Sequence, residues 1–189
     1  MNRHAIIAPL LALSLAGCGG GGLTTVGGTV SGLTSGTAVT LQNNGSDTLV
    51  VASNGPFTFS QELSDGDAYS VAIIVQPAGA TCLLANPSGT IDNNASKVTN
   101  VTVTCTATYL LGGTVSGLGS GESVTLQNNG ADPVSVPSNG SFRFPTRVPT
   151  GSSYTVTVTA SPANKTCKVT NEVGTVQGAD VTNVTVTCS

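Results

Sequence analysis

Five cysteines are the residues of this 189-residue chain best suited to chemistry: Cys18, Cys82, Cys105, Cys167 and Cys188. A thiol can act as a nucleophile, bind a metal ion, join another thiol in a disulfide or carry a lipid. No two of them have the Cys-x-x-Cys spacing of a redox motif, and the single histidine is His4, near the N-terminus. The spacing therefore disfavours a redox or metal site.

Other catalytic groups are scarce. A nucleophilic serine or threonine needs an adjacent base, and beyond His4 the chain has no histidine. Asp65 and Asp67 form the only close pair of carboxylates. We interpret them as residues of a solvated turn; the alternative, weak calcium binding, needs a spaced series of further oxygen ligands that the sequence does not supply. We therefore predict no catalytic residue, no cofactor and no metal.

The N-terminus resembles the signal peptide of bacterial lipoproteins. Arg3 precedes an apolar run over residues 5–15, and Leu15-Ala16-Gly17-Cys18 is similar to a lipobox. An apolar run this short suits a signal peptide better than a membrane-spanning helix. The resemblance implies that residues 1–17 are removed and that Cys18 carries the lipid anchor. The alternative is an ordinary secretory signal with a chance cysteine.

The segment after Cys18 indicates how the anchor would be used. Residues 18–25 are glycine-rich and without periodicity, which predicts a short flexible tether. Gly19, rather than an acidic residue, follows the cysteine, and this resembles the pattern of lipoproteins sent to the outer membrane. We therefore expect an exported protein that is lipid-anchored in the bacterial cell envelope.

Composition limits the partners. Six Lys and Arg against nine Asp and Glu give a formal net charge of −3, and only 8% of the residues are charged. A weakly acidic, charge-poor surface argues against nucleic acid and against electrostatic docking to anionic lipid. The remaining candidates are the membrane through the lipid anchor, an envelope protein or another copy of the chain.

The body of the chain consists of two copies of one sequence repeat. Residues 28–33 return 85 positions later as residues 113–118, and residues 98–105 return as residues 181–188. The repetition predicts two independent domains, because units of this length exceed those of solenoid repeats. The expected boundaries are repeat 1 at residues 26–105, a linker at residues 106–111 and repeat 2 at residues 112–189.

Within each repeat the hydrophobic period is two. Tyr69, Val71, Ile73 and Val75 alternate with residues assigned to the exposed face, which indicates β-strands. Asn-Gly pairs between such runs predict tight hairpin turns. In repeat 1 the pattern predicts seven strands, at residues 28–32, 37–42, 48–52, 56–60, 68–76, 81–85 and 98–105, and a short extended piece at residues 88–91. The expected fold class is all-β, with two tandem antiparallel β-sandwich domains that are Ig-like or prealbumin-like.

One short motif supports this fold. Residues 53–59, with Gly66 and Tyr69-Ser70-Val71 after them, resemble the signature of prealbumin-like sandwiches, a group that includes carboxypeptidase regulatory-like and Cna-B-type modules. Residues 138–144, Gly151 and Tyr154 carry the motif again. The chain departs from Cna-B modules in one respect: neither repeat has a lysine in its first strands that could form an isopeptide bond.

Disulfides are the expected covalent brace. With Cys18 assigned to lipid, four cysteines remain in a chain exported to an oxidising compartment. Of the three possible connectivities, Cys82 with Cys105 and Cys167 with Cys188 keeps each bond within one repeat.

Differences between the repeats suggest a candidate partner surface. Val50, Ile74 and Leu83 are assigned to exposed positions, and repeat 2 has Ser135, Thr159 and Lys168 in their places. We expect the three apolar side chains to be exposed and grouped, with neutral drift after duplication as the alternative.

The leading functional hypothesis is a non-enzymatic cell-envelope lipoprotein that acts as a structural, spacer or adhesive surface module. The alternative is a ligand-binding lipoprotein, for carbohydrate or for a partner subunit of an envelope complex.

Overall fold

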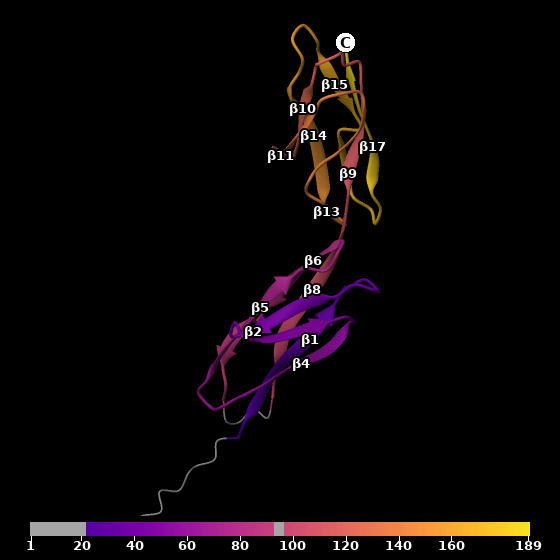
Figure 1. Ribbon diagram of the computed structural model, residues 1–189. Coiled ribbons are helices and arrows are strands. Elements are labelled where there is room, and N and C mark those ends of the chain that lie inside the picture. Colours follow the sequence, from indigo (N-terminus) through magenta and orange to yellow (C-terminus); the bar gives the residue numbers. More distant parts are fainter. Residues whose placement is uncertain (1–21, 93–96) are drawn as a thin grey trace, which may run out of the picture.

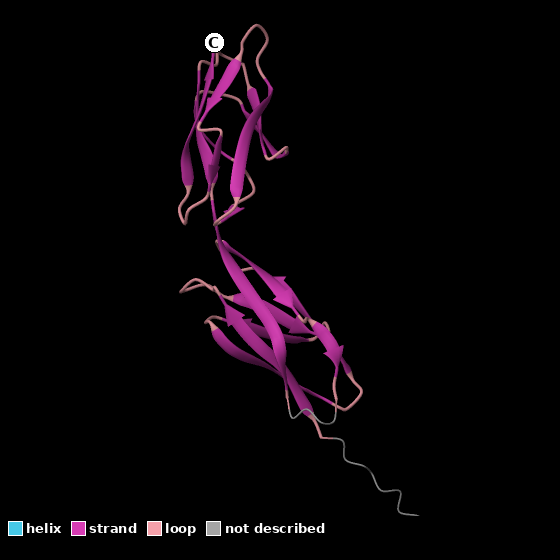
Figure 2. Ribbon diagram, turned by 180° about the vertical axis from the view of Figure 1, so that it is seen from behind, coloured by secondary structure: helices cyan, strands magenta, loops and turns pink. Residues whose placement is uncertain are grey.

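A computed structural model describes residues 22–92 and 97–189, and all the regular structure in these ranges is β. The two repeats form two β-sandwiches that follow each other end to end (Figures 1 and 2). In repeat 1 the strands are β1 (Thr24–Ser31), β2 (Val39–Asn43), β3 (Asp47–Val51), β4 (Gly55–Leu63), β5 (Ala68–Val75), β6 (Ala80–Ala85), β7 (Ser88–Thr90) and β8 (Val98–Tyr109). In repeat 2 they are β9 (Leu111–Ser116), β10 (Val124–Asn128), β11 (Ala131–Val136), β12 (Gly140–Arg143), β13 (Val148–Pro149), β14 (Ser153–Ala160), β15 (Cys167–Thr170), β16 (Val173–Thr175) and β17 (Val181–Cys188).

Each repeat consists of two sheets with the same strand order. In repeat 1 one sheet runs β4-β1-β8-β6 and the other β3-β2-β5-β7; in repeat 2 the equivalents are β12-β9-β17-β15 and β11-β10-β14-β16. Within each repeat every pairing is antiparallel except one. The first and last strands, β1 with β8 and β9 with β17, lie side by side in parallel. The predicted fold of two tandem sandwiches is confirmed, and this parallel pair is the feature that the alternating pattern did not predict.

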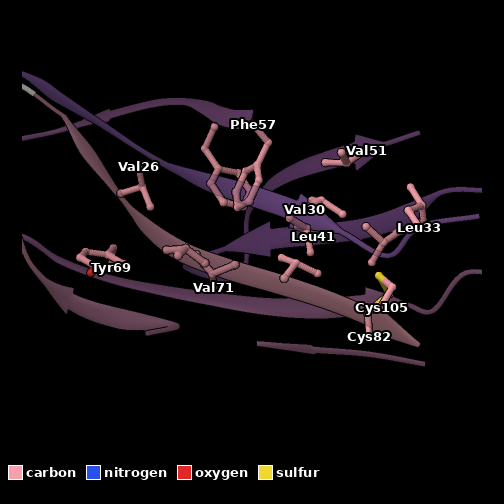
Figure 3. Packing of buried hydrophobic residues seen from close by; sticks show 14 of the residues in the cluster. Val26, Val30, Leu33, Leu41, Val51, Phe57, Tyr69, Val71, Cys82 and Cys105 are labelled. Atoms are coloured by element: carbon pink, nitrogen blue, oxygen red, sulfur yellow. A yellow bond between two sulfur atoms is a disulfide. The ribbon is translucent and has the colours of Figure 1, made fainter. Parts of the chain in front are cut away.

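Each sandwich has its own hydrophobic core. The fully buried side chains come from alternate positions of facing strands, as the period of two predicted. In repeat 1 they include Phe59, together with Val26 and Leu41 (Figure 3). The Phe57 and Phe59 rings meet edge to face with centroids 5.8 Å apart, and Phe142 and Phe144 repeat this contact in the second core.

One assignment in the alternating pattern is wrong. Val75 was placed on the inner face but is 54% exposed. A β-bulge lies between β2 and β5: Leu41 pairs with Ile73, whereas Thr40 pairs with Val75. The extra residue, Ile74, shifts the phase, because one inserted residue exchanges inward and outward positions in the rest of the strand.

The Asn-Gly pairs have two different roles. Asn44 and Gly45 have φ angles of 48° and 69° and form the predicted hairpin turn between β2 and β3. Asn54-Gly55 does not form a hairpin, which corrects the prediction, because β3 and β4 belong to different sheets. Its asparagine side chain instead accepts a hydrogen bond from the Leu33 N–H at 2.8 Å and donates one to the Leu33 carbonyl at 2.9 Å.

The observed strands extend beyond two predicted boundaries. β1 begins at Thr24, within the segment assigned to the tether, and pairs there with Leu63 of β4. β8 continues to Tyr109, within the segment assigned to the linker. The tether residues before 22 lie outside the described residues.

Candidate functional site

The four cysteines of the repeats serve the fold. Cys82 bonds Cys105 and Cys167 bonds Cys188, as the favoured connectivity predicted. Both bonds join residues that lie directly opposite each other on neighbouring strands, with Cα atoms 3.9 and 4.0 Å apart. Closing loops of this length stabilises a fold by about 3 kcal/mol in the chain-entropy model. Cys18, the predicted lipidation site, lies outside the described residues.

The carboxylate pair is part of a turn. Asp67 Oδ2 accepts a hydrogen bond from the Ser64 N–H at 2.7 Å, and the Asp67 N–H donates to the Ser64 carbonyl. Gly66, between the two acids, has a φ of 81° and donates its N–H to the Ile91 carbonyl. These bonds explain Asp67 as a structural residue of the turn between β4 and β5. In the described part of the chain no group of three or more His, Cys, Asp or Glu is placed to hold a metal ion.

The three residues of the candidate partner surface are exposed and come from three different strands. Val50, Ile74 and Leu83 are 63, 46 and 71% exposed. Val50 on β3 and Ile74 on β5 belong to one sheet, in which Thr40 pairs with both Val50 and the exposed Val75. Leu83 on β6 belongs to the other sheet, opposite Thr104 of β8. Gln76, just after β5, hydrogen-bonds to Cys82 of β6, so the edges of the two sheets meet close to Leu83. Whether the three side chains form one surface stays a prediction.

The junction between the repeats is a site that sequence reasoning missed. The end of β8 hydrogen-bonds to both repeats: the Thr108 N–H donates to the Gly79 carbonyl of repeat 1 at 2.8 Å, and the Ala107 carbonyl accepts from the Thr150 N–H of repeat 2 at 2.9 Å. β8 also pairs with β13, Tyr109 facing Val148. The expected linker is therefore a strand shared by two domains.

Arg147 of repeat 2 reinforces this junction. Its Nη2 and Nε donate to the Thr108 carbonyl at 2.7 and 3.2 Å, and Nε also lies 3.2 Å from the Thr108 hydroxyl. Asp180 lies 3.9 Å from the guanidinium and accepts the Leu110 N–H at 2.8 Å. Because the ion pair is long and partly exposed, we ascribe the stabilisation to the hydrogen bonds. The only sequence signal was that repeat 1 has Glu62 where repeat 2 has Arg147.

A second polar cluster closes the far end of repeat 2. Lys165 Nζ donates to Glu122 Oε2 at 2.7 Å and to the Gly117 carbonyl at 2.6 Å. The same carboxylate oxygen accepts the Gly119 N–H at 2.7 Å. The hydrogen bond from Lys165, and then that from Gly119, hold the pKa of Glu122 below its ordinary value of 4.5. Repeat 1 has Ala80 in place of Lys165 and Thr37 in place of Glu122. This cluster around Lys165 and Glu122, called the Glu122 clasp below, is therefore specific to repeat 2.

The cavities are shallow. One of about 350 Å³ lies between loops 33–36 and 52–54, and its lining carries no charged side chain. Another, of about 210 Å³, is lined by the Gly112-Gly113 pair between Arg143 and Asp180. Ligand sites are typically clefts of about 300 to 1,000 Å³ with a few convergent polar groups. The second cavity is smaller than this range, and the first offers no charged group to a ligand.

The described ranges also contain no helix long and apolar enough to cross a membrane. No protein-family model matches the chain, and the comparison with curated proteins gives no match.

Solved structures give remote likenesses. The chain is similar to the Bacillus anthracis TIE protein (15% identity, TM-score 0.33, covering 88% of this chain and 34% of that one) and to the pilus adhesin SpaC from Lactobacillus rhamnosus GG (12%, 0.33, 88% and 30%). A bacterial adhesin from Mobiluncus mulieris with intramolecular disulfide, isopeptide and ester bond cross-links matches at 13% identity and a TM-score of 0.30, covering 87% of this chain and 97% of that one. The chain thus spans about a third of the first two. Likenesses at these scores carry no argument about function.

Proposed function

We propose that this protein is a non-enzymatic cell-envelope lipoprotein whose two repeats form a stiff spacer that holds a structural or adhesive surface away from the membrane. The observation that carries the proposal is the shared strand β8. Domains of one chain usually move relative to each other, because most interdomain contacts are small and polar. Here the connecting residues are hydrogen-bonded to both domains instead of forming a loose loop.

The shape agrees with a spacer. The chain enters repeat 1 at one end of the molecule, and its C-terminus lies at the far end of repeat 2 (Figure 1). A lipid on Cys18 would leave only a few residues between the membrane and β1, which begins at Thr24. Repeat 2 would then be held one domain length from the membrane surface.

The anchor is tested by cell fractionation. We expect the Cys18→Ser variant to leave the membrane fraction, because losing its acyl chains removes the apolar surface that binds the bilayer. Ser14→Ala, in the signal segment but outside the lipobox, is the matched control and should stay with the membranes. A Cys18→Ser protein that still sediments with membranes after a salt wash would contradict the anchor.

The spacer is tested by a distance measurement. Ser35 and Ser120 are exposed and occupy equivalent positions in the two repeats. Spin labels placed there on unnatural residues, which leave the disulfides intact, should give one narrow distance distribution. A broad distribution would show freely moving repeats and would exclude a stiff spacer.

Crosslinking in intact envelopes addresses the adhesive or structural role. Surface exposure without a stoichiometric partner agrees with the proposal. Recovery of one stoichiometric envelope protein would instead favour a subunit of an envelope complex. Binding of the purified protein to a glycan array would favour a carbohydrate-binding lipoprotein.

A further inference from the structure

We infer that in each repeat the parallel pair of first and last strands is a clamp that resists tension along the chain. This inference rests on the proposed function in one respect: a spacer between an anchored end and a bound distal end is pulled lengthwise. The clamp itself depends only on the geometry of the repeats.

The direction of the load follows from the strand order. Tension enters repeat 1 at the start of β1 and leaves at the end of β8, and these two strands are parallel neighbours. Pulling the start of one strand against the end of the other slides them past each other. All the hydrogen bonds between them are then loaded together, whereas pulling both strands from the same end would open the bonds one at a time. Sliding therefore requires a larger force for the same set of bonds.

The same arrangement recurs in repeat 2. Tension enters β9 from the junction and leaves at the end of β17, and the parallel register runs from Leu111 opposite Val181 to Ser116 opposite Thr187. The two clamps are thus in series along the chain. The junction strand β8 connects them directly, because β9 begins only two residues after Tyr109.

The hydrophobic core covers the clamp bonds on the inner face of the sheet. Val101 and Val103 on β8 are completely buried, and Val30 on β1 is 2% exposed. Gly28 allows β1 and β8 to approach closely, since a Cβ there would lie 1.7 Å from the Val101 carbonyl oxygen. In repeat 2 a Cβ on Gly113 would lie at the same distance from the Val184 carbonyl oxygen. From this inner face, water cannot reach the hydrogen bonds and replace them while the strands slide.

Each disulfide ties the end of β8 or β17 at which the load leaves. Cys105 lies at the end of the β1–β8 register and is bonded to Cys82 on the other neighbour, β6. The load applied at Cys105 is therefore shared with β6. After the clamp fails, residues 83–104 stay inside the closed loop and do not extend, which limits how far an unfolded repeat lengthens.

Single-molecule pulling of the full chain tests the clamp through the direction of force. Handles on unnatural residues at Gly22 and Ser189 load both parallel pairs in sliding. Handles at Ser120, in the loop just after β9, and at Ser189, just after β17, pull the same β9–β17 pair from one end and should open it bond by bond. Both pairs of handles load the β9–β17 pair of the same chain, so the comparison for repeat 2 differs in the direction of the load.

We expect the force that unfolds a repeat to be several-fold lower with the handles at Ser120 and Ser189. Equal forces in the two directions would overturn the clamp.

Reduction should lengthen the unfolding step of repeat 1 by about 80 Å and that of repeat 2 by about 70 Å, given disulfide loops of 23 and 21 residues and about 3.6 Å per extended residue. Steps unchanged by reduction would overturn the closed-loop limit. Both results are independent of membrane fractionation, so a failed clamp and a failed anchor are told apart.

Discussion

At the scale of single residues, Arg147 is the side chain with which repeat 2 holds the strand that leaves repeat 1. Its guanidinium donates to the carbonyl and contacts the hydroxyl of Thr108, a residue that is 5% exposed. Hydrogen bonds from a charged donor are stronger than neutral ones, and a guanidinium offers several in one fixed plane. The orientation of the two repeats therefore depends on the hydrogen bonds from Arg147 to Thr108 more than on the long ion pair between Arg147 and Asp180.

We expect Arg147→Ala to broaden the distance distribution between labels at Ser35 and Ser120 while leaving the unfolding of each repeat nearly unchanged. The change removes bonds that cross the junction but no core side chain. Arg143→Ala, four residues away on an exposed position, is the matched control and should leave the distribution narrow. A narrow distribution in the Arg147→Ala protein would mean that backbone pairing alone fixes the junction.

Glu122 should make repeat 2 sensitive to acid. Its pKa in the folded protein is lowered, so its contribution to stability is complete above the ordinary value of 4.5 and is lost as the pH falls through the folded pKa. Glu122→Gln should therefore lower the melting temperature at neutral pH, and the difference from the parent should shrink towards zero in acid. Glu172→Gln, an exposed change of the same charge, serves as the control in thermal unfolding across this pH range. A difference independent of pH would contradict the clasp.

At the scale of elements, the alternating pattern predicted most strands within two or three residues, because one face of each strand is buried and the other exposed. It failed where partners outside the local pattern decide the structure. The bulge at Ile74 depends on the pairing of β5 with β2. The extension of β8 depends on hydrogen bonds to Gly79 in one repeat and to Thr150 in the other. Nothing in the local sequence of residues 106–109 indicates that these distant residues are its partners.

The candidate sites divide in the same way. The cysteine pairing was predictable because the repeats restrict which cysteines are neighbours. The distribution of Val50, Ile74 and Leu83 over two sheets was not, because alternation tells inside from outside but not which sheet a strand joins. The junction and the Glu122 clasp involve residues far apart in sequence, and no spacing rule brings them together.

The repeated Gly-Gly pair shows how one element depends on a missing side chain. A Cβ on Gly113 would lie 1.7 Å from the Val184 carbonyl oxygen, so β9 and β17 would have to separate. We expect Gly113→Ala to destabilise repeat 2 by about 3 kcal/mol, as overpacking at a buried position does. Chemical denaturation gives the comparison with the exposed neighbour Thr114→Ala, which should change stability by about 0.5 kcal/mol or less. Equal effects of the two changes would show that the strands can relax.

At the scale of the whole molecule, repeat 2 begins before residue 112, the boundary that the sequence repeat predicts. Repeat 2 uses residues that precede residue 112. Leu111 is fully buried in its core, and the Leu110 carbonyl accepts the Val181 N–H at 2.8 Å. Tyr109 packs on the same core and pairs with Val148 of β13. The folding unit of repeat 2 thus begins within the predicted linker.

This boundary leads to a prediction for isolated repeats. A chain of residues 106–189 should fold cooperatively and be more stable than one of residues 112–189 by about 2 kcal/mol, since burying one leucine side chain contributes about 1.5 to 3 kcal/mol. Urea denaturation of the two chains measures the difference. Residues 106–189 with Leu111→Ala separates the packing of that side chain from the pairing of β13 with Tyr109 and Thr108: if both matter, its stability should fall between the other two. Equal stability of the two lengths would show that repeat 2 is complete from residue 112 and that the shared strand belongs to repeat 1 alone.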